Sequence, residues 1–66
     1  MGGDLESIRS RLEAISEELA DLALDRLREA VGGDVRAPAE ERLLSRARRA
    51  VDKAAAILGA QADDGA

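Results

Sequence analysis

The side chains that could carry chemistry in this sequence are carboxylates and guanidiniums, because the 66 residues include neither histidine nor cysteine. Four carboxylates recur at steps of four residues, a spacing that forms a row along a helix: Glu13, Glu17, Asp21 and Asp25. Di-iron bundles place a histidine three residues after a glutamate, and this chain has no histidine for that role. The row leaves open a divalent-cation site made only of carboxylates, but we expect no metal or other cofactor.

Catalysis is not predicted. General acid–base chemistry by paired carboxylates needs an enclosed pocket that shifts one pKa, and two helices without aromatic residues enclose little volume. A serine nucleophile needs a base, and the sequence has neither histidine nor a Gly-x-Ser-x-Gly turn. We therefore interpret the serines as residues of polar helix faces: Ser7, Ser10, Ser16 and Ser45.

A basic row in the second half of the chain has a structural and a functional interpretation. The row consists of Arg42, Arg46, Arg49 and Lys53. In the structural interpretation it faces the acidic row and sets the register of two helices, as flanking charges do in coiled coils. The expected pairs are Asp25 with Arg46, Asp21 with Arg49 and Glu17 with Lys53, each contributing roughly 0 to 1 kcal/mol.

The functional interpretation assigns the arginine-rich segment to a ligand or a partner. Guanidiniums are suited to phosphate groups and to guanine edges. The residues of this possible ligand or partner face are Glu41, Ser45, Arg46, Arg48 and Arg49.

Glu41, Ser45 and Arg48 also form a Glu-x-x-x-Ser-x-x-Arg spacing. It resembles the first part of the pattern in the cyclic-di-GMP-binding anti-sigma factors of actinobacteria, which also use helical hairpins. In that family the pattern continues with Gln and Asp at further four-residue steps, where this chain has Asp52 and Ala56. The resemblance implies a transcription regulator that responds to a nucleotide second messenger or binds a sigma-factor-type partner.

The acidic row lies on a long amphipathic stretch that predicts a helix over about residues 4–31. Its apolar residues recur at steps of three and four: Leu5, Ile8, Leu12, Ile15, Leu19 and Leu22. Arg26 then takes the next heptad position, and the stripe shifts to Ala23, Leu27 and Val31. A stripe that rotates in this way favours a helix with two neighbours, as in a bundle.

Gly32-Gly33 predicts the end of this helix, because glycine adopts the left-handed backbone that caps helix C-termini. We expect a turn over residues 32–37, a second helix over about 38–58 that starts at Pro38, and a frayed tail over 59–66. Gly59 is the expected stop. The short turn makes the two helices antiparallel neighbours within one domain, residues 1–66.

Folding at this turn pairs Leu19 with Val51 and Leu12 with Leu58, so the first two turns of helix 1 extend beyond helix 2. Leu5 and Ile8 would then form an uncovered apolar patch, which another chain could cover. The sequence therefore predicts an all-α, two-helix antiparallel hairpin that self-associates into a dimeric four-helix bundle. The expected interface consists of Leu5, Ile8, Leu12, Ile15, Leu19 and Leu22.

The amino-acid composition narrows the classes of partner that we expect. A net charge of −4 argues against nucleic acid, and the acidic polar face without Trp or Phe argues against membrane surfaces. The absence of cysteine and of a long apolar run predicts a cytoplasmic location. The predicted function is non-enzymatic protein–protein interaction, as a scaffold, adaptor or regulatory subunit, with a second copy or another helical protein as the partner.

Overall fold

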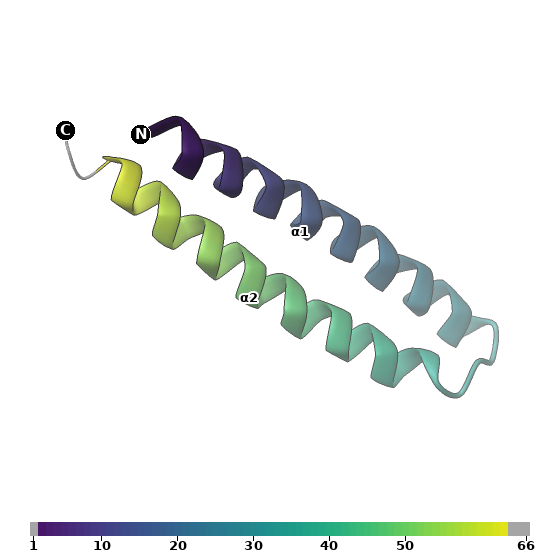
Figure 1. Cartoon of the computed structure of the whole chain (residues 1–66). Coiled ribbons are helices and arrows are strands. Elements are labelled where there is room, and N and C mark those ends of the chain that lie inside the picture. The colour runs from purple at the N-terminus through teal and green to yellow at the C-terminus, as the bar shows by residue number, and fades with distance from the viewer. Residues whose placement is uncertain (1, 64–66) are drawn as a thin grey trace.

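The computed structural model describes residues 2–63 and consists of two helices packed against each other. Helix α1 spans Gly2–Val31 and helix α2 spans Ala37–Asp63. They run antiparallel, so that the start of α1 and the end of α2 lie at one end of the hairpin and the turn lies at the other (Figure 1). The Cα atoms extend over 50 × 14 × 12 Å. The predicted all-α helical hairpin is confirmed.

The paired glycines end α1 as predicted. Gly33 has φ of 104°, and its amide donates to the carbonyl of Ala30 at 3.1 Å. The next amide, of Asp34, donates to the carbonyl of Glu29 at 2.9 Å. This pair of backward bonds is a Schellman motif with glycine at the left-handed position, and it satisfies carbonyls that the end of the helix leaves free.

The turn is one residue shorter than predicted, because α2 begins at Ala37. The Asp34 side chain accepts a hydrogen bond from the Arg36 amide at 2.9 Å, and its backbone carbonyl accepts one from the Ala37 amide at 3.3 Å. An aspartate that binds the backbone two residues onward directs the chain into a turn. Pro38 therefore occupies the second helical position.

The predicted end of helix 2 at residue 58 is wrong, and so is the frayed tail from residue 59. Helix α2 continues through Gly59 to Asp63. Alanines precede this glycine at residues 54–56 and follow it at residues 60 and 62, and alanine has the highest helix propensity, which offsets the cost of one glycine. Of the tail, residues 64–66 lie outside the described part of the chain.

The longer α2 also removes the predicted overhang of helix 1. The two helices have 30 and 27 residues, and a Cβ added to Gly59 would lie 3.5 Å from Cδ of Arg9. Residue 59 thus reaches the second turn of α1. Leu5, predicted to overhang, is half-buried.

The contact between the helices follows a regular heptad on each of them. On α1 a row of buried and half-buried residues recurs at steps of four and three: Leu5, Arg9, Leu12, Ser16, Leu19, Ala23, Arg26 and Ala30. On α2 the corresponding row is Ala37, Glu41, Leu44, Val51, Ala55 and Leu58, and the heptad position between Leu44 and Val51 holds the exposed Arg48. Other half-buried residues lie beside these rows, namely Ala20, Ser45, Ala54 and Gly59. We call these two rows the seam. The stripe rotation predicted after Leu22 does not occur in the seam, because Arg26 keeps its heptad position there.

The seam is thin. The buried residues within the described chain are small, namely Ser16, Ala23, Ala37 and Ala55, and none of the large side chains is fully buried. Small residues let two helix backbones approach closely, but each one removes little apolar area from water. The hairpin therefore obtains little stabilisation from its own interior.

Candidate functional site

The six residues predicted for an oligomer interface divide into two rows. Leu5, Leu12 and Leu19 are half-buried in the seam. Ile8, Ile15 and Leu22 are 42%, 44% and 43% exposed, and they recur every seven residues along one side of α1. Half of the apolar stripe is therefore used within the chain, and the other half faces solvent.

Helix α2 carries a matching exposed row with the same period. Leu43 and Ile57 are 61% and 57% exposed, and the exposed Ala50 lies midway between them. Leu43 lines a small hollow with Arg26, which lies one turn after Leu22 on α1. The rows of the two helices thus lie on the same side of the hairpin.

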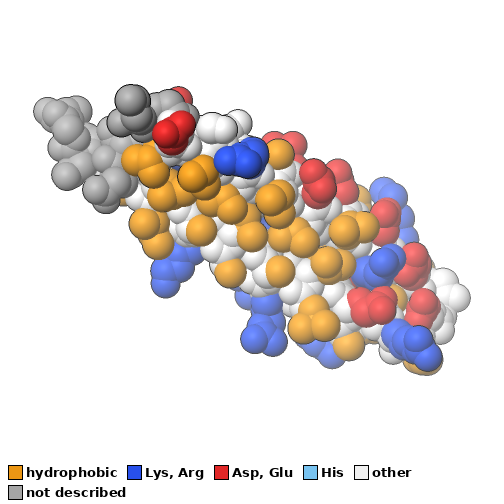
Figure 2. Space-filling model, in the orientation of Figure 1, with side chains coloured by type: hydrophobic (Ala, Val, Ile, Leu, Met, Phe, Trp, Pro, Cys, Tyr) orange, Lys and Arg blue, Asp and Glu red, His pale blue; other side chains and the backbone are white. Residues whose placement is uncertain are grey.

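Together the two rows form one continuous surface. Figure 2 shows hydrophobic side chains running along both helices on the face toward the viewer. We call this surface the apolar face; its residues are Ile8, Ile15, Leu22, Leu43, Ala50 and Ile57. Contiguous apolar surface on a small chain is typical of a protein–protein contact.

Charges of opposite sign border the two edges of the apolar face. On α1, Glu18 and Asp25 follow Ile15 and Leu22 by three residues; on α2, Arg46 and Lys53 follow Leu43 and Ala50 by three residues. Red side chains gather along the α1 edge in Figure 2, and blue ones project from the α2 edge. The α2 border of the face is therefore basic, and the α1 border is acidic at Glu18 and Asp25, although Arg11, three residues after Ile8, is basic.

The remaining exposed large hydrophobics lie toward the turn: Leu24, Leu27, Val31 and Val35. Leu24 is nine residues from Ile15, and nine residues of an α-helix are about two and a half turns. The two side chains therefore point to opposite sides of α1, although their exposures, 46% and 44%, are nearly equal.

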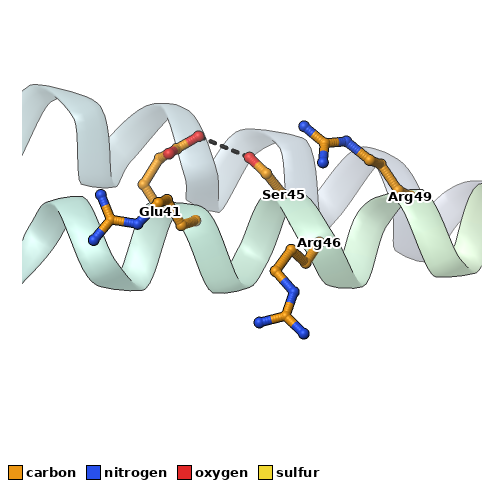
Figure 3. A pocket seen from close by; sticks show the side chains of 5 residues that line it. Glu41, Ser45, Arg46 and Arg49 are labelled. Atoms are coloured by element: carbon orange, nitrogen blue, oxygen red, sulfur yellow. Dashed lines mark hydrogen bonds between the residues drawn. The ribbon is translucent and has the colours of Figure 1, made fainter.

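The arginine-rich segment of α2 lines a shallow hollow of ≈ 310 Å³ with Glu41, Arg42, Ser45, Arg46 and Arg49. The Ser45 hydroxyl donates to Oε2 of Glu41 at 2.7 Å (Figure 3). In that view the guanidiniums of Arg46 and Arg49 point in different directions. The hollow therefore offers several separate donors around one carboxylate, and they do not converge on a single point.

The structure brings four of the five predicted ligand-face residues to this hollow. The fifth, Arg48, does not line it, and its Nε lies 3.8 Å from a carboxylate oxygen of Asp52. The Glu-x-x-x-Ser spacing places Glu41 and Ser45 one turn apart in direct contact, whereas Arg48 belongs to a different contact.

The predicted pairing of the acidic and basic rows is wrong. Among residues 4–60, the ion pairs within α1 or α2 join Arg9 to Glu6 and Glu13, Arg26 to Glu29, Arg28 to Asp25, and Arg48 to Asp52. The one pair that crosses the seam joins Arg26 Nε to Glu40 Oε1 at 3.2 Å. A step of four residues advances about 40° around a helix, so the acidic row leaves the side of α1 that faces α2.

Several residues of the seam are not predicted by the apolar pattern, and Ser16 and Arg26 are the two that the pattern assigns to a different role. The pattern predicts a polar-face position for Ser16, but this residue is buried, and its hydroxyl donates to Asp52 across the seam. The predicted register, which sets Leu19 opposite Val51, would instead place Ala54 opposite Ser16. The apolar stripe predicts that the heptad ends at Arg26. The signal that Arg26 belongs to the seam is its spacing of seven residues from Leu19, which continues the spacing of Leu5, Leu12 and Leu19.

Within the described residues, no group of three carboxylates is arranged to hold a metal ion, and neither helix is long and apolar enough to cross a membrane. No protein-family model, curated protein or solved structure matches the chain.

Proposed function

We propose that this chain is a non-enzymatic protein–protein interaction module that acts by self-association, with two hairpins packing through their apolar faces into a four-helix bundle. The observation that supports the proposal is the apolar face itself. Two rows of large aliphatic side chains on both helices remain between 42% and 61% exposed, while the seam buries only small residues.

The energetics favour a covered face. A chain of this size gains only roughly 3 to 5 kcal/mol of net stability from one core, and this seam lacks a large buried side chain. Full burial of a Leu or Ile stabilises by about 1.5 to 3 kcal/mol, so covering the exposed part of each one contributes about 1 kcal/mol. Five such side chains on each copy would contribute as much as the hairpin interior does.

The size of the face also suits a second copy. Cα extents of 50 Å and 14 Å give the broad side of the hairpin an area of about 700 Å². Stable protein–protein interfaces use roughly 800 Å² on each partner. A second hairpin presents a surface of the same length, width and apolar character, so the two match without any further element.

Two variants test the proposal. Ile15→Glu places a charge on the apolar face, and Leu24→Glu places the same charge at an equally exposed position on the opposite side of α1. We expect Ile15→Glu to raise the dimer dissociation constant at least tenfold and Leu24→Glu to change it less than threefold. Equal effects, or a larger effect of Leu24→Glu, would reject the apolar face as the interface.

A second candidate function is a ligand-responsive regulator that uses the hollow at Glu41 and Ser45. The supporting observation is that Arg42, Arg46 and Arg49 line this hollow and join none of the ion pairs within residues 4–60. A cyclic dinucleotide that binds there would raise the melting temperature at low salt. An unchanged melting temperature for both the wild-type chain and Arg49→Ala would leave self-association as the proposed function.

A further inference from the structure

The apolar face allows two symmetric dimers, which differ in the helix that each helix contacts. Two identical surfaces meet about a two-fold axis that lies in the interface. With the axis parallel to the helices, α1 packs on α2 of the second copy and both turns lie at one end. With the axis perpendicular to the helices, α1 packs on α1, α2 packs on α2, and the turns lie at opposite ends.

We propose that the second copy packs with its turn at the same end, so that α1 of each chain lies against α2 of the other. This inference rests on the proposed self-association and specifies its geometry. Three properties of the two helices support it: their charge, the charges at the borders of the apolar face, and the sizes of the side chains that would meet.

The two helices differ in net charge. Helix α1 carries eight acidic and four basic residues, and α2 carries four acidic and five basic residues, which gives −4 and +1. Packing α1 on α1 would bring two acidic helices together. Packing α1 on α2 brings opposite charges together, and complementary charge selects among alternative helix pairings.

The charges at the borders of the apolar face distinguish the two dimers more clearly than the net charges of the helices do. If α2 packed antiparallel on α2, Arg46 and Lys53 of one copy would lie beside the same basic pair of the other. If α1 packs on α2, Glu18 and Asp25 on one copy lie beside Arg46 and Lys53 on the other. Glu18, Arg46 and Lys53 join none of the ion pairs within residues 4–60, and they would then pair between chains, as would Asp25 in addition to its contact with Arg28.

Side-chain sizes agree with this choice. A two-fold axis parallel to the helices leaves every residue at its own height, and the Ser16–Asp52 contact shows which heights correspond. Ile15 of α1 then lies opposite residue 53 of α2, between Ala50 and Ile57, and Leu22 lies opposite residue 46, between Leu43 and Ala50. The large side chains of one row therefore meet the spaces between those of the other row. The alternative dimer packs each row against its own copy.

A distance between the two turns tests the geometry. Val35 in the turn is 91% exposed and the chain has no cysteine, so Val35→Cys accepts one spin label per chain. In the proposed dimer the interhelical spacing puts the labels less than about 30 Å apart. A label separation near the 50 Å length of the hairpin would overturn this geometry but retain self-association. Absence of any interchain distance at a concentration of about ten times the dissociation constant would overturn both.

A charge-reversal cycle provides the matched control. We expect Glu18→Lys with Asp25→Lys to raise the dimer dissociation constant about tenfold at low salt, and the addition of Arg46→Glu with Lys53→Glu to restore it. In the alternative dimer each row meets its own copy, so the reversal of a row leaves its repulsion unchanged. A dissociation constant that the first pair of substitutions does not change would therefore overturn the proposal.

Discussion

The hydroxyl of Ser16 donates a hydrogen bond to a carboxylate oxygen of Asp52, and this contact joins the middle of α1 to the middle of α2. Ser16 is buried, whereas half of the Asp52 side chain is exposed. The contact fixes which turn of α2 lies opposite which turn of α1. With the Arg26–Glu40 ion pair near the turn, it defines the register of the hairpin through polar groups within an apolar seam.

This relationship predicts coupling between the two residues. Ser16→Ala and Asp52→Ala each remove the hydrogen bond, so the double variant should lose about 1 kcal/mol less than the sum of the two single losses. Chemical denaturation of the four chains measures this difference. Strictly additive losses would show that the two side chains do not interact.

The small residues of the seam should not tolerate larger side chains. Ala55 is 8% exposed, and Ala55→Leu would force the helices apart at a cost of about 1 to 3 kcal/mol. The neighbouring Ala56 is exposed, so Ala56→Leu serves as the control and should change stability by less than about 0.5 kcal/mol. Thermal unfolding of both variants checks the prediction, and similar melting temperatures would contradict a close-packed seam at Ala55.

Replacing each of two glycines with alanine should have opposite effects on the stability of the chain. Gly33 has φ of 104°, so Gly33→Ala should destabilise the chain by about 1 to 2 kcal/mol. Gly59 lies within α2, and its new Cβ would make ordinary contact with Arg9 at 3.5 Å, so Gly59→Ala should stabilise by about 1 kcal/mol. Helicity and melting temperature measure both effects. If Gly59→Ala destabilised the chain, this result would contradict a helix that continues through Gly59 and would favour the helix end predicted at residue 58.

Arg26 keeps a heptad position in the seam with a side chain 30% exposed. Arg26→Leu removes a partly exposed ion pair with Glu40, which contributes roughly 0 to 1 kcal/mol, and adds apolar contact that contributes more. We expect the variant to be more stable by about 1 kcal/mol. Arg28→Leu, at a position 70% exposed, is the control and should be near neutral. A loss of stability in Arg26→Leu beyond that of Arg28→Leu would show that the ion pair is the larger contribution.

The sequence was sufficient to predict the helices, the antiparallel turn and the cap at Gly33, because these depend on periodicity and on local backbone chemistry. It was insufficient at Gly59, where propensity alone suggests a stop but the neighbouring alanines continue the helix. Of the candidate site, spacing predicted the aliphatic stripe, but only the packing shows that Leu12 lies in the seam while Ile15 faces solvent.

The difference between the predicted and the observed register explains the wrong predictions about which residues lie opposite each other. It was inferred from apolar pairs, and several registers satisfy a seam of Leu and Ala equally well. Polar contacts decide between them, and the Ser16–Asp52 contact cannot be distinguished in the sequence from a serine on a solvated face. The acidic row was misplaced because its four-residue step drifts around the helix, whereas the seam follows a step of three and a half.

Self-association is the central claim, and sedimentation equilibrium of the wild-type chain over about a hundredfold range of concentration tests it most directly. One chain has a mass of 7.0 kDa. The proposed dimer predicts a mass that approaches twice this value as the concentration rises into the micromolar range, where small helical bundles of modest interface area associate. A mass that stays at 7.0 kDa while the chain remains helical would contradict the account.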